Sequence, residues 1–346
     1  MVSKKRDILR GKGGLVFIQK IIISLSLMFV CLYIFPVYAN ASENKENIYQ
    51  ERMHLYKSYE TPFVPWHRLA AVDQYERNIQ EVRKDIPKRD SAIAIQFSHE
   101  FWVGEFNPNI EDTSPFTIQY FGGNGLDGNG DGKADRNDDQ DVLFTMVSYL
   151  EKFGPSEEDF KNALWEYYKD EKIINQIMTI NTLYKHFNTI QLDKHIFPLP
   201  VRGYNYSYKG TWGASRGWGG RRIHEGTDIF AGYGTPVLST SYGVVEVMGW
   251  NQFGGWRVGI RDHHNTYHYY AHLAYYNKDL KVGDIVEPGT ILGGVGSSGY
   301  GKEGTSGKFP PHLHYGMYKF NGRTEWAFDP YPHLLQWEKQ TKQEKK

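Results

Sequence analysis

The chain has 346 residues, with 40 Lys plus Arg balanced by 40 Asp plus Glu. This balance excludes a strong net field that would steer the protein toward nucleic acid or anionic lipid, so no nucleic-acid partner is expected. A length prior of about 150 residues per domain predicts two domains. Aromatic residues make up 15% of the chain and glycine occurs 36 times, which is typical of a β-rich protein with a ring-lined groove.

The N-terminus carries export signals. Lysines and arginines precede an apolar run over residues 21–35, and Val37-Tyr-Ala-Asn-Ala41 suits a signal peptidase. Residues 1–41 are therefore predicted to be a signal peptide cleaved after Ala41. The alternative is a retained anchor, the only case in which a membrane partner is expected, although the run is shorter than the ~20 apolar residues that span a bilayer. The single cysteine, Cys31, lies in this segment, so thiol chemistry is excluded from the remaining, exported chain.

The part after this segment begins with a polar leader, residues 42–60, and continues as a mainly helical domain over 61–195. Apolar residues recur at helical spacing from Trp66 to about Lys84. A second helix is predicted from Asp139 to Phe153, and helical patterning continues from Pro155 to about Phe187.

Short alternating runs separated by turn signals replace this pattern beyond about residue 195. They predict an all-β domain over 196–333, followed by a polar tail, 334–346. The expected strands are residues 237–239, 243–247, 256–260, 266–272 and 312–320. The expected fold class is thus α+β and multidomain.

Two stretches of the β domain offer metal ligands, Arg222-Ile-His-Glu-Gly-Thr-Asp228 and Pro311-His-Leu-His-Tyr315. Alternate side chains of a strand share a face, so His312 and His314 would point one way and Tyr315 the other, into a core. Two His and one carboxylate are the ligand set of a catalytic zinc site with an open position for water. Any one of the 13 histidines alone would more simply be an ordinary core or surface residue.

The stretch Thr266-Tyr-His-Tyr-Tyr-Ala-His272 predicts a strand with His268, Tyr270 and His272 on one face. A non-ligand imidazole from it could polarise a substrate carbonyl or assist proton transfer. His263 and His264, in a polar turn, are expected to be solvated.

Three of these motifs together resemble the signatures of the lysostaphin-type M23 zinc metallopeptidases: His224-x-x-x-Asp228, Tyr270-Ala-His272-Leu273 and His312-Leu-His314. The similarity covers roughly residues 198–332. It implies a small antiparallel β fold, one zinc ion and a groove for peptidoglycan peptides. It further implies that His224, Asp228 and His314 ligate zinc, that His312 is the general base, and that His272 stabilises the tetrahedral intermediate.

Nearby residues narrow the resemblance to a subgroup that cleaves the L-Ala–D-Glu bond of stem peptides during sporulation; these are Trp212, Trp218, Arg221, Arg222 and Gly254-Gly255-Trp256. Arg221 or Arg222 could pair with a substrate carboxylate, or the two could be a plain surface pair. The expected function is a secreted, cell-wall-associated zinc endopeptidase acting on peptidoglycan stem peptides in wall or spore-cortex maturation. Alternatives are a catalytically silent wall-binding or scaffold protein and a bifunctional hydrolase that also cleaves glycan.

The first domain carries two further motifs. Leu69-Ala-Ala-Val-Asp-Gln-Tyr-Glu76 resembles the catalytic helix of lysozyme-like transglycosylases, although Arg77-Asn78 replaces their usual Ser-Gly. Glu76 is thus a candidate general acid if it is buried, and inert if it faces solvent. The side chains of a Gly- and Asp-rich loop match the spacing of a calcium loop; they are Asp127, Asn129, Asp131, Asp135 and Asp138. A polar turn that binds nothing is the alternative.

Overall fold

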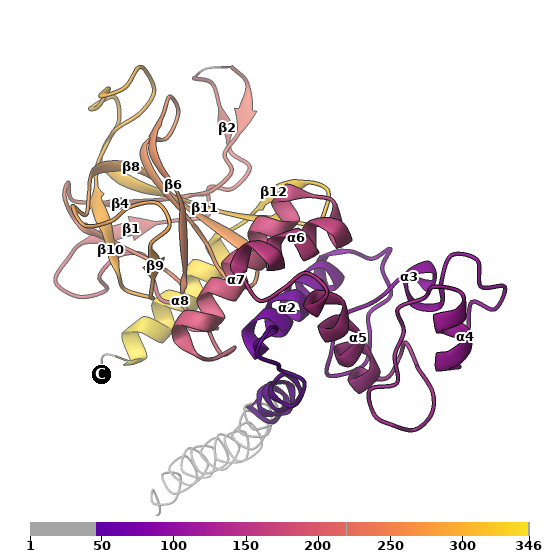
Figure 1. The fold of residues 1–346 in the computed structure, drawn as a ribbon. Helices are drawn as coiled ribbons and strands as arrows, with labels where there is room; N and C mark the ends of the chain where they lie inside the picture. The colour runs from indigo at the N-terminus through magenta and orange to yellow at the C-terminus, as the bar shows by residue number, and fades with distance from the viewer. Residues whose placement is uncertain (1–45, 219, 345–346) are drawn as a thin grey trace, which may run out of the picture. The chain divides into compact units, whose positions relative to one another are not determined.

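The computed structural model describes residues 46–218 and 220–344, with helices first, strands next and a helix last (Figure 1). The helices before the sheet are α2 (Trp66–Val82), α3 (His99–Val103), α4 (Pro115–Tyr120), α5 (Asp139–Glu151), α6 (Glu157–Tyr168) and α7 (Glu171–Phe187). The strands are β1 (Tyr206–Tyr208), β2 (Ser215–Arg216), β3 (Arg222–Ile223), β4 (Thr227–Ala231), β5 (Pro236–Leu238), β6 (Gly243–Asn251), β7 (Gly255–Arg261), β8 (Thr266–Tyr276), β9 (Ile285–Val286), β10 (Ile291–Val295), β11 (His312–Phe320) and β12 (Glu325–Phe328). Helix α8 (Tyr331–Glu344) follows them.

The helical half, α2 to α7, is built on α2, which packs against α7 and α5. The patterning predicted as continuous from Pro155 to Phe187 is divided into α6 and α7. Lys169 has a left-handed φ of 53° and ends α6, and the Asp170 carboxylate then caps α7 by accepting from two backbone N–H groups. This break lets the two helices pack at an angle instead of continuing as one rod.

Residues 46–58 are helical, so the predicted loose leader is wrong for this part of the chain. Tyr56 is fully buried, and its hydroxyl donates to Asp73 over 2.6 Å. The predicted signal peptide, its cleavage after Ala41 and the alternative anchor lie outside the described residues. None of the helices that the structure describes is both long enough and apolar enough to cross a membrane.

The sheet half, β1 to α8, is an antiparallel sheet in the order β1-β4-β11-β8-β7-β6-β9. Strand β10 pairs with β5 and β8, β12 pairs with β11, and β2 and β3 form a separate hairpin. The central strands thus bring β4, β11 and β8 side by side, although they come from distant parts of the sequence (Figure 1).

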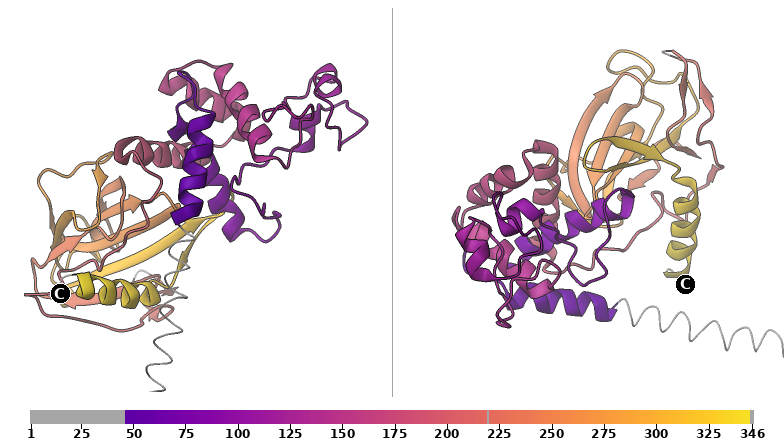
Figure 2. Two further views of the ribbon diagram at one scale, coloured as in Figure 1. Left: turned by 90° about the horizontal axis from the view of Figure 1, so that it is seen from below. Right: turned by 90° about the vertical axis from the view of Figure 1, so that its right-hand side faces the viewer.

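The core lies on one face of this sheet. Leu313 and Tyr315 of β11 are fully buried there, as the alternation predicted. Helix α8 packs against the same core through Leu334 and Trp337 (Figure 2). The prediction of a polar tail over 334–346 is therefore wrong for its described part. The segment is rich in charged residues, but its few apolar residues recur at helical spacing and form one buried face of α8.

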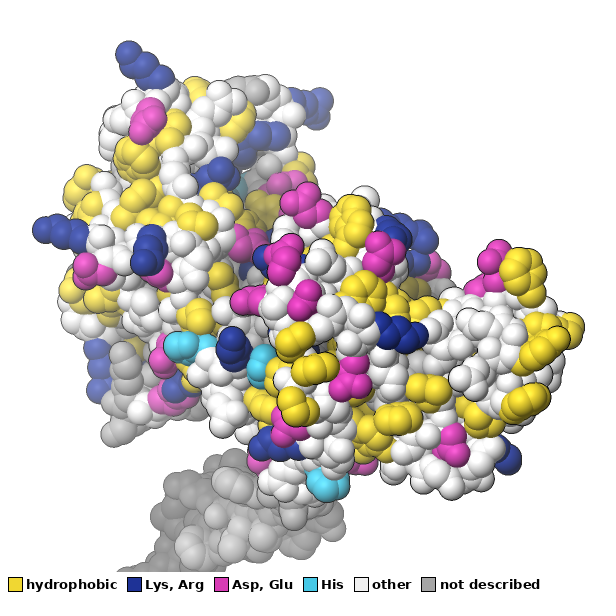
Figure 3. All heavy atoms as spheres, viewed as in Figure 1, with side chains coloured by type: hydrophobic (Ala, Val, Ile, Leu, Met, Phe, Trp, Pro, Cys, Tyr) yellow, Lys and Arg dark blue, Asp and Glu magenta, His cyan; other side chains and the backbone are white. Residues whose placement is uncertain are grey.

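The two halves meet at the β7–β8 turn, where Asn78 of α2 donates to the carbonyl of His263 over 2.9 Å. Lys172 of α7 also approaches Glu325 of β12 at 3.3 Å. On the face shown in Figure 3, basic and acidic side chains are interspersed, in keeping with the zero net charge.

Candidate active site

The pairing of β4 with β11 sets the centre of the site. His314 lies directly opposite Asp228 in the ladder, so the two side chains leave the same face of the sheet. His224 follows the short strand β3 and reaches this point through the turn at Glu225-Gly226. A Cβ on Gly226 would lie only 2.6 Å from Cε1 of His314, so a residue with a side chain at this position would clash with the imidazole.

The three predicted ligands converge. Nε2 of His224 and Nδ1 of His314 are each 3.0 Å from Oδ1 of Asp228 and 2.9 Å from one another. His224 and Asp228 are buried. Burial alone would raise the pKa of Asp228, but interactions with His224 and His314 hold it well below its usual range. The carboxylate is therefore ionised and able to bind a cation.

Outer contacts hold these groups in place. Nδ1 of His224 donates to the carbonyl of Thr211 over 2.9 Å, which leaves Nε2 with its lone pair facing the cluster. Arg216, from the β2–β3 hairpin, donates to Oδ2 of Asp228 over 2.5 Å. The guanidinium occupies one carboxylate oxygen and leaves the other for the histidines.

Two more imidazoles border the cluster. Nδ1 of His312 donates to the carbonyl of Pro310 over 2.8 Å, and Nδ1 of His272 donates to that of Ser298 over 2.7 Å. In the neutral tautomer that results, Nε2 of each ring carries a free lone pair. Burial lowers the pKa of both histidines, and neighbouring histidines lower that of His272 further. Both imidazoles are therefore expected to be neutral and able to accept a proton.

His272 reaches the site by a local break in its strand. Along β8, Val258 of β7 pairs with Tyr270 but Trp256 pairs with Leu273, so β8 carries one extra residue, a β-bulge. His272 has a φ of 64°, and this left-handed conformation turns its ring out of the strand alternation.

The prediction that His268 and Tyr270 share the face of His272 is wrong. Both are fully buried in the core on the opposite side of the sheet. His268 bonds the hydroxyl of Tyr315 through Nδ1 and Asp262 through Nε2, at 2.7 and 2.9 Å. It is a core histidine with both ring nitrogens satisfied.

A pocket of about 650 Å³, called the groove below, surrounds the cluster. Its aromatic lining is Phe230, Phe253, Tyr267, Tyr269, Tyr300, Phe309 and Tyr318. Of the two arginines that the sequence offered, Arg222 lines the groove, and Arg257 lines it as well. Nε of each is buried and has no hydrogen-bond partner within residues 46–218 and 220–344. Arg221 is exposed and is not among the lining residues.

Comparison with known proteins agrees with this geometry. The model of Peptidase family M23 matches residues 222–330. The L-Ala--D-Glu endopeptidase of Bacillus subtilis (strain 168) is 52% identical over 323 residues, which are 93% of this chain and 99% of that protein. The chain belongs to peptidase family M23.

Other relatives of this M23 peptidase match a smaller part of the chain. Lysostaphin of Staphylococcus staphylolyticus is 37% identical over 114 residues, which cover 32% of this chain and 22% of lysostaphin. The solved catalytic domain of lysostaphin from Staphylococcus simulans is 33% identical and covers 39% of this chain and 95% of that domain, with a TM-score of 0.31.

Sequence reasoning missed the groups that hold the histidines of this M23 site. Three of them are main-chain carbonyls, those of Thr211, Ser298 and Pro310. Every residue has a main-chain carbonyl, so the sequence does not show which ones accept hydrogen bonds from the histidines. Arg216 and Arg257 could have been found only by knowing that the β2–β3 hairpin and β7 border the groove.

The helical half has a pocket of its own, also about 650 Å³, which is called the helical pocket below. It is lined by Glu76, Gln96, Ser98, Phe101, Tyr149, Phe153, Glu166 and Tyr167. Burial raises the pKa of Glu76 to about 7, although Tyr168 opposes this by donating to Oε1 over 2.6 Å. Glu76 is therefore half-buried in this pocket, between the two cases that the sequence left open, while the lysozyme-like character of this half stays a prediction.

The predicted calcium loop is organised by hydrogen bonds. Asp127 and Asn129 accept from backbone N–H groups inside the loop, and Asp138 caps α5. Asp131 and Asp135 likewise accept from the N–H groups of Lys133 and Asn137. The buried carboxylate of Asp141, which was not among the predicted ligands, accepts three further N–H groups of the loop. This geometry fits the alternative of a polar turn and gives calcium no support.

Proposed function

We propose that this protein is a zinc-dependent endopeptidase that hydrolyses the L-Ala–D-Glu bond of peptidoglycan stem peptides. The observation that carries the proposal is the convergence of His224, Asp228 and His314 beside two imidazoles with free Nε2 atoms in an aromatic groove. The name of the Bacillus subtilis relative supports the choice of bond. Because this substrate lies in the cell wall, we expect the protein to act outside the cytoplasm, in wall or spore-cortex maturation.

The donor set fits zinc. Zn²⁺ binds imidazole nitrogen and carboxylate oxygen, and catalytic sites use three protein ligands. Nε2 of His224, Nδ1 of His314 and Oδ1 of Asp228 supply these atoms, and no part of the group needs a thiol. Ligand histidines usually donate their second ring nitrogen to an acceptor, as His224 does to Thr211.

When bound, zinc would supply Lewis acidity toward the scissile carbonyl and lower the pKa of a water to about 7. His312 would accept the proton of the attacking water at Nε2, since Nδ1 is fixed on Pro310. The same Nε2–H can then pass the proton to the leaving amine. His272 presents a lone pair when neutral, so it can stabilise an oxyanion only after it has itself taken a proton.

The arginines of the groove suit an acidic substrate. A D-Glu residue next to the scissile bond carries a carboxylate, and a guanidinium binds carboxylates through a planar fork of N–H donors. Arg222 and Arg257 both line the groove, and the buried Nε of each lacks a hydrogen-bond partner in the part of the chain that the structure describes. We propose that these two, and not Arg221, contact the substrate carboxylate.

A digest of purified peptidoglycan analysed by mass spectrometry tests the function. The expected products are fragments ending in L-Ala and fragments beginning with D-Glu, formed with zinc and lost with a chelator. Intact stem peptides in the presence of bound zinc would overturn the proposal in favour of a wall-binding or scaffold protein. New termini at another peptide bond would overturn only the choice of L-Ala–D-Glu.

Glycan cleavage by the helical half is a second candidate function. It is favoured by the placement of Glu76, whose pKa of about 7 leaves a large protonated fraction at neutral pH, in a pocket with aromatic walls. Its test is the release of new sugar ends in the same digest, with Glu76→Gln as the inactive variant. Sugar ends that persist in Glu76→Gln would exclude this carboxyl as the acid.

A further inference from the structure

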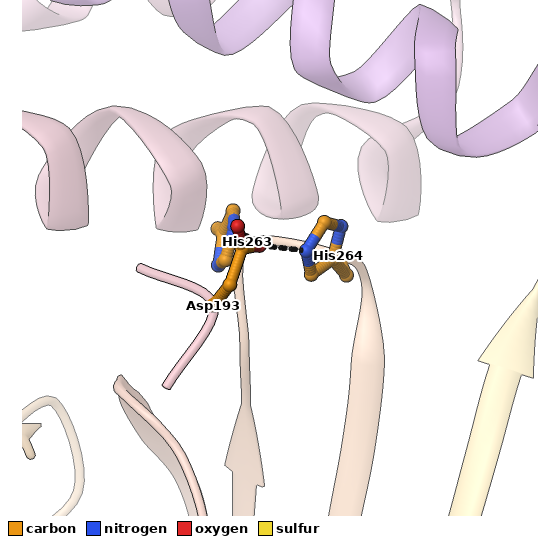
Figure 4. A group of neighbouring side chains, drawn as sticks. All are labelled: Asp193, His263 and His264. Atoms are coloured by element: carbon orange, nitrogen blue, oxygen red, sulfur yellow. Dashed lines mark hydrogen bonds and ion pairs between the residues drawn. The ribbon is translucent and has the colours of Figure 1, made fainter. Parts of the chain in front are cut away.

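A second group of two histidines and one aspartate lies where the helical half meets the sheet half. Asp193 belongs to the segment between α7 and β1, while His263 and His264 form the tip of the β7–β8 turn. Figure 4 shows the three side chains pointing toward one another beneath the helices. The motifs of the peptidase do not include this group, which is called the junction cluster below. Six residues of β8, from Thr266 to His272, separate this turn from the His272 imidazole, a span of roughly 20 Å at ~3.3 Å per residue.

The backbone of this turn is held by hydrogen bonds on two sides. Asp262 accepts from the backbone N–H of Thr266 through Oδ1, over 2.8 Å, and Asn265 adopts a left-handed φ of 60°. Asn78 of α2 donates to the carbonyl of His263 from the other side. The turn therefore presents two adjacent imidazoles, whose ring centroids are 4.0 Å apart.

The donor atoms are spaced as in a metal site. Oδ1 of Asp193 is 2.7 Å from Nε2 of His264 and 3.5 Å from Nε2 of His263. In a tetrahedral zinc site with bonds of ~2.0 Å, donors lie about 3.3 Å apart. The proposed catalytic ligands show separations of 2.9 to 3.0 Å in the same structure. Small side-chain shifts would adapt either group to a cation.

The protein contacts of His263 satisfy only one of its two ring nitrogens. This residue is 1% exposed, its Nδ1 has no hydrogen-bond partner among the described residues, and its Nε2 faces the Asp193 carboxylate at 3.5 Å, which is long for a hydrogen bond. A buried nitrogen without a partner costs free energy, whereas both nitrogens of the neighbouring His268 are bonded. The side chains of His264 and Asp193 are 32% and 27% exposed, so an ion can enter from solvent.

We propose that Asp193, His263 and His264 bind a second divalent transition metal of the zinc class. Two imidazoles and one carboxylate match this class rather than calcium or magnesium, which require oxygen ligands. The ion would join the segment before the sheet half to a turn 70 residues further on. Its role is structural, because it fixes the junction against which α2 packs.

Metal analysis of the full chain after equilibrium dialysis against zinc tests the site. Wild type is expected to hold two equivalents, and His264→Ala and Asp193→Asn one each. His224→Ala removes the other equivalent, and the double variant His224→Ala/His264→Ala retains none. His186→Ala, at an exposed histidine of α7, is the matched control and should keep both. A single equivalent in wild type that only His224→Ala removes would overturn the proposal, as would a second equivalent lost with His186→Ala.

Thermal melting gives an independent readout without catalysis. In His224→Ala, saturating zinc is expected to raise the Tm by about 5 °C, and adding His264→Ala or Asp193→Asn should abolish this rise. An equal rise in the double variants would contradict the site. Zinc-saturated His264→Ala should cleave stem peptides at wild-type rate, so failure of the junction cluster and failure of the peptidase proposal are distinguishable.

Discussion

The groove in the sheet half and the helical pocket are equal in volume but differ in how they gather chemistry. In the groove, neighbouring strands place side chains from residues 224, 228, 272, 312 and 314 around one point, and backbone carbonyls fix three of the rings. In the helical pocket the carboxyl of Glu76, in the middle of α2, has a raised pKa because of its burial. Strand register thus brings several titratable side chains to one point, whereas the helix contributes one titratable group whose state depends on its surroundings.

The largest effect is expected from removing a proposed metal ligand. His314→Ala should lose the catalytic zinc equivalent and lower kcat/KM for stem-peptide cleavage by at least about 1,000-fold, because both metal functions disappear. The measurements are metal content and a muropeptide digest. If His314→Ala kept full activity and normal zinc content, the groove would not be the peptidase site, and the contrast drawn above between the groove and the helical pocket would be wrong.

Next in size is the loss of the proposed base. His312→Gln should keep zinc but lower kcat by about 100-fold to 10,000-fold with little change in KM, because amide hydrogen-bonding remains while proton transfer does not. Single-turnover kinetics on zinc-saturated protein measure this. A variant that fails to bind zinc would instead make His312 a ligand.

A smaller effect is expected on substrate binding. Arg222→Gln and Arg257→Gln should each raise KM about 10-fold, since a charge-assisted hydrogen bond to a carboxylate contributes roughly 1.5–3 kcal/mol. Arg221→Gln is the matched control and should leave KM unchanged. Equal effects at Arg221 and Arg222 would point to general surface charge instead.

The smallest effect concerns Glu76 and depends on pH. Its pKa of about 7 lies above the ordinary 4.5, so the folded state favours the protonated form. The stability it contributes is complete below about pH 4.5 and is lost as the pH rises through 7. Glu76→Gln should therefore match wild type at pH 4 and be more stable by about 1–3 kcal/mol at pH 8. Denaturant melts at both pH values test this, with the exposed Glu81→Gln of the same helix as control; a difference that is the same at both pH values would contradict the raised pKa.

The convergence of the proposed metal ligands could be predicted from the sequence because strand alternation and one turn determine it. His312 and His314 share a face by alternation, and the turn at Glu225-Gly226 brings His224 to Asp228. The position of His272 could not be predicted in this way, since a bulge and a positive φ override alternation and depend on the neighbouring strand. His263 was predicted to be solvated because its turn is polar, whereas its ring is buried and lies against Tyr184 of α7.

In the helical half, too, local structure could be predicted from the sequence, but features that depend on tertiary contacts could not. Helix positions were predictable from apolar spacing, and the caps at Ser156 and Asp170 explain where α6 and α7 begin. The loop ending at Asp138 was ambiguous because calcium ligands and turn-forming side chains are the same residue types. The hydrogen bonds within the loop, and those that the buried carboxylate of Asp141 accepts from it, favour the turn and could not be read from residue types.

The packing of α8 has a consequence for how the sheet half reaches its folded state. Trp337 and Leu334 complete the core beneath Tyr315, and Thr341 accepts the N–H of Phe197, which precedes β1. A core completed by a segment so distant in sequence from β4 depends on contacts of long sequence separation, which form slowly because a long loop must close first. The face of the sheet that carries the groove histidines is therefore held by a helix whose described residues make no contact with the substrate groove itself.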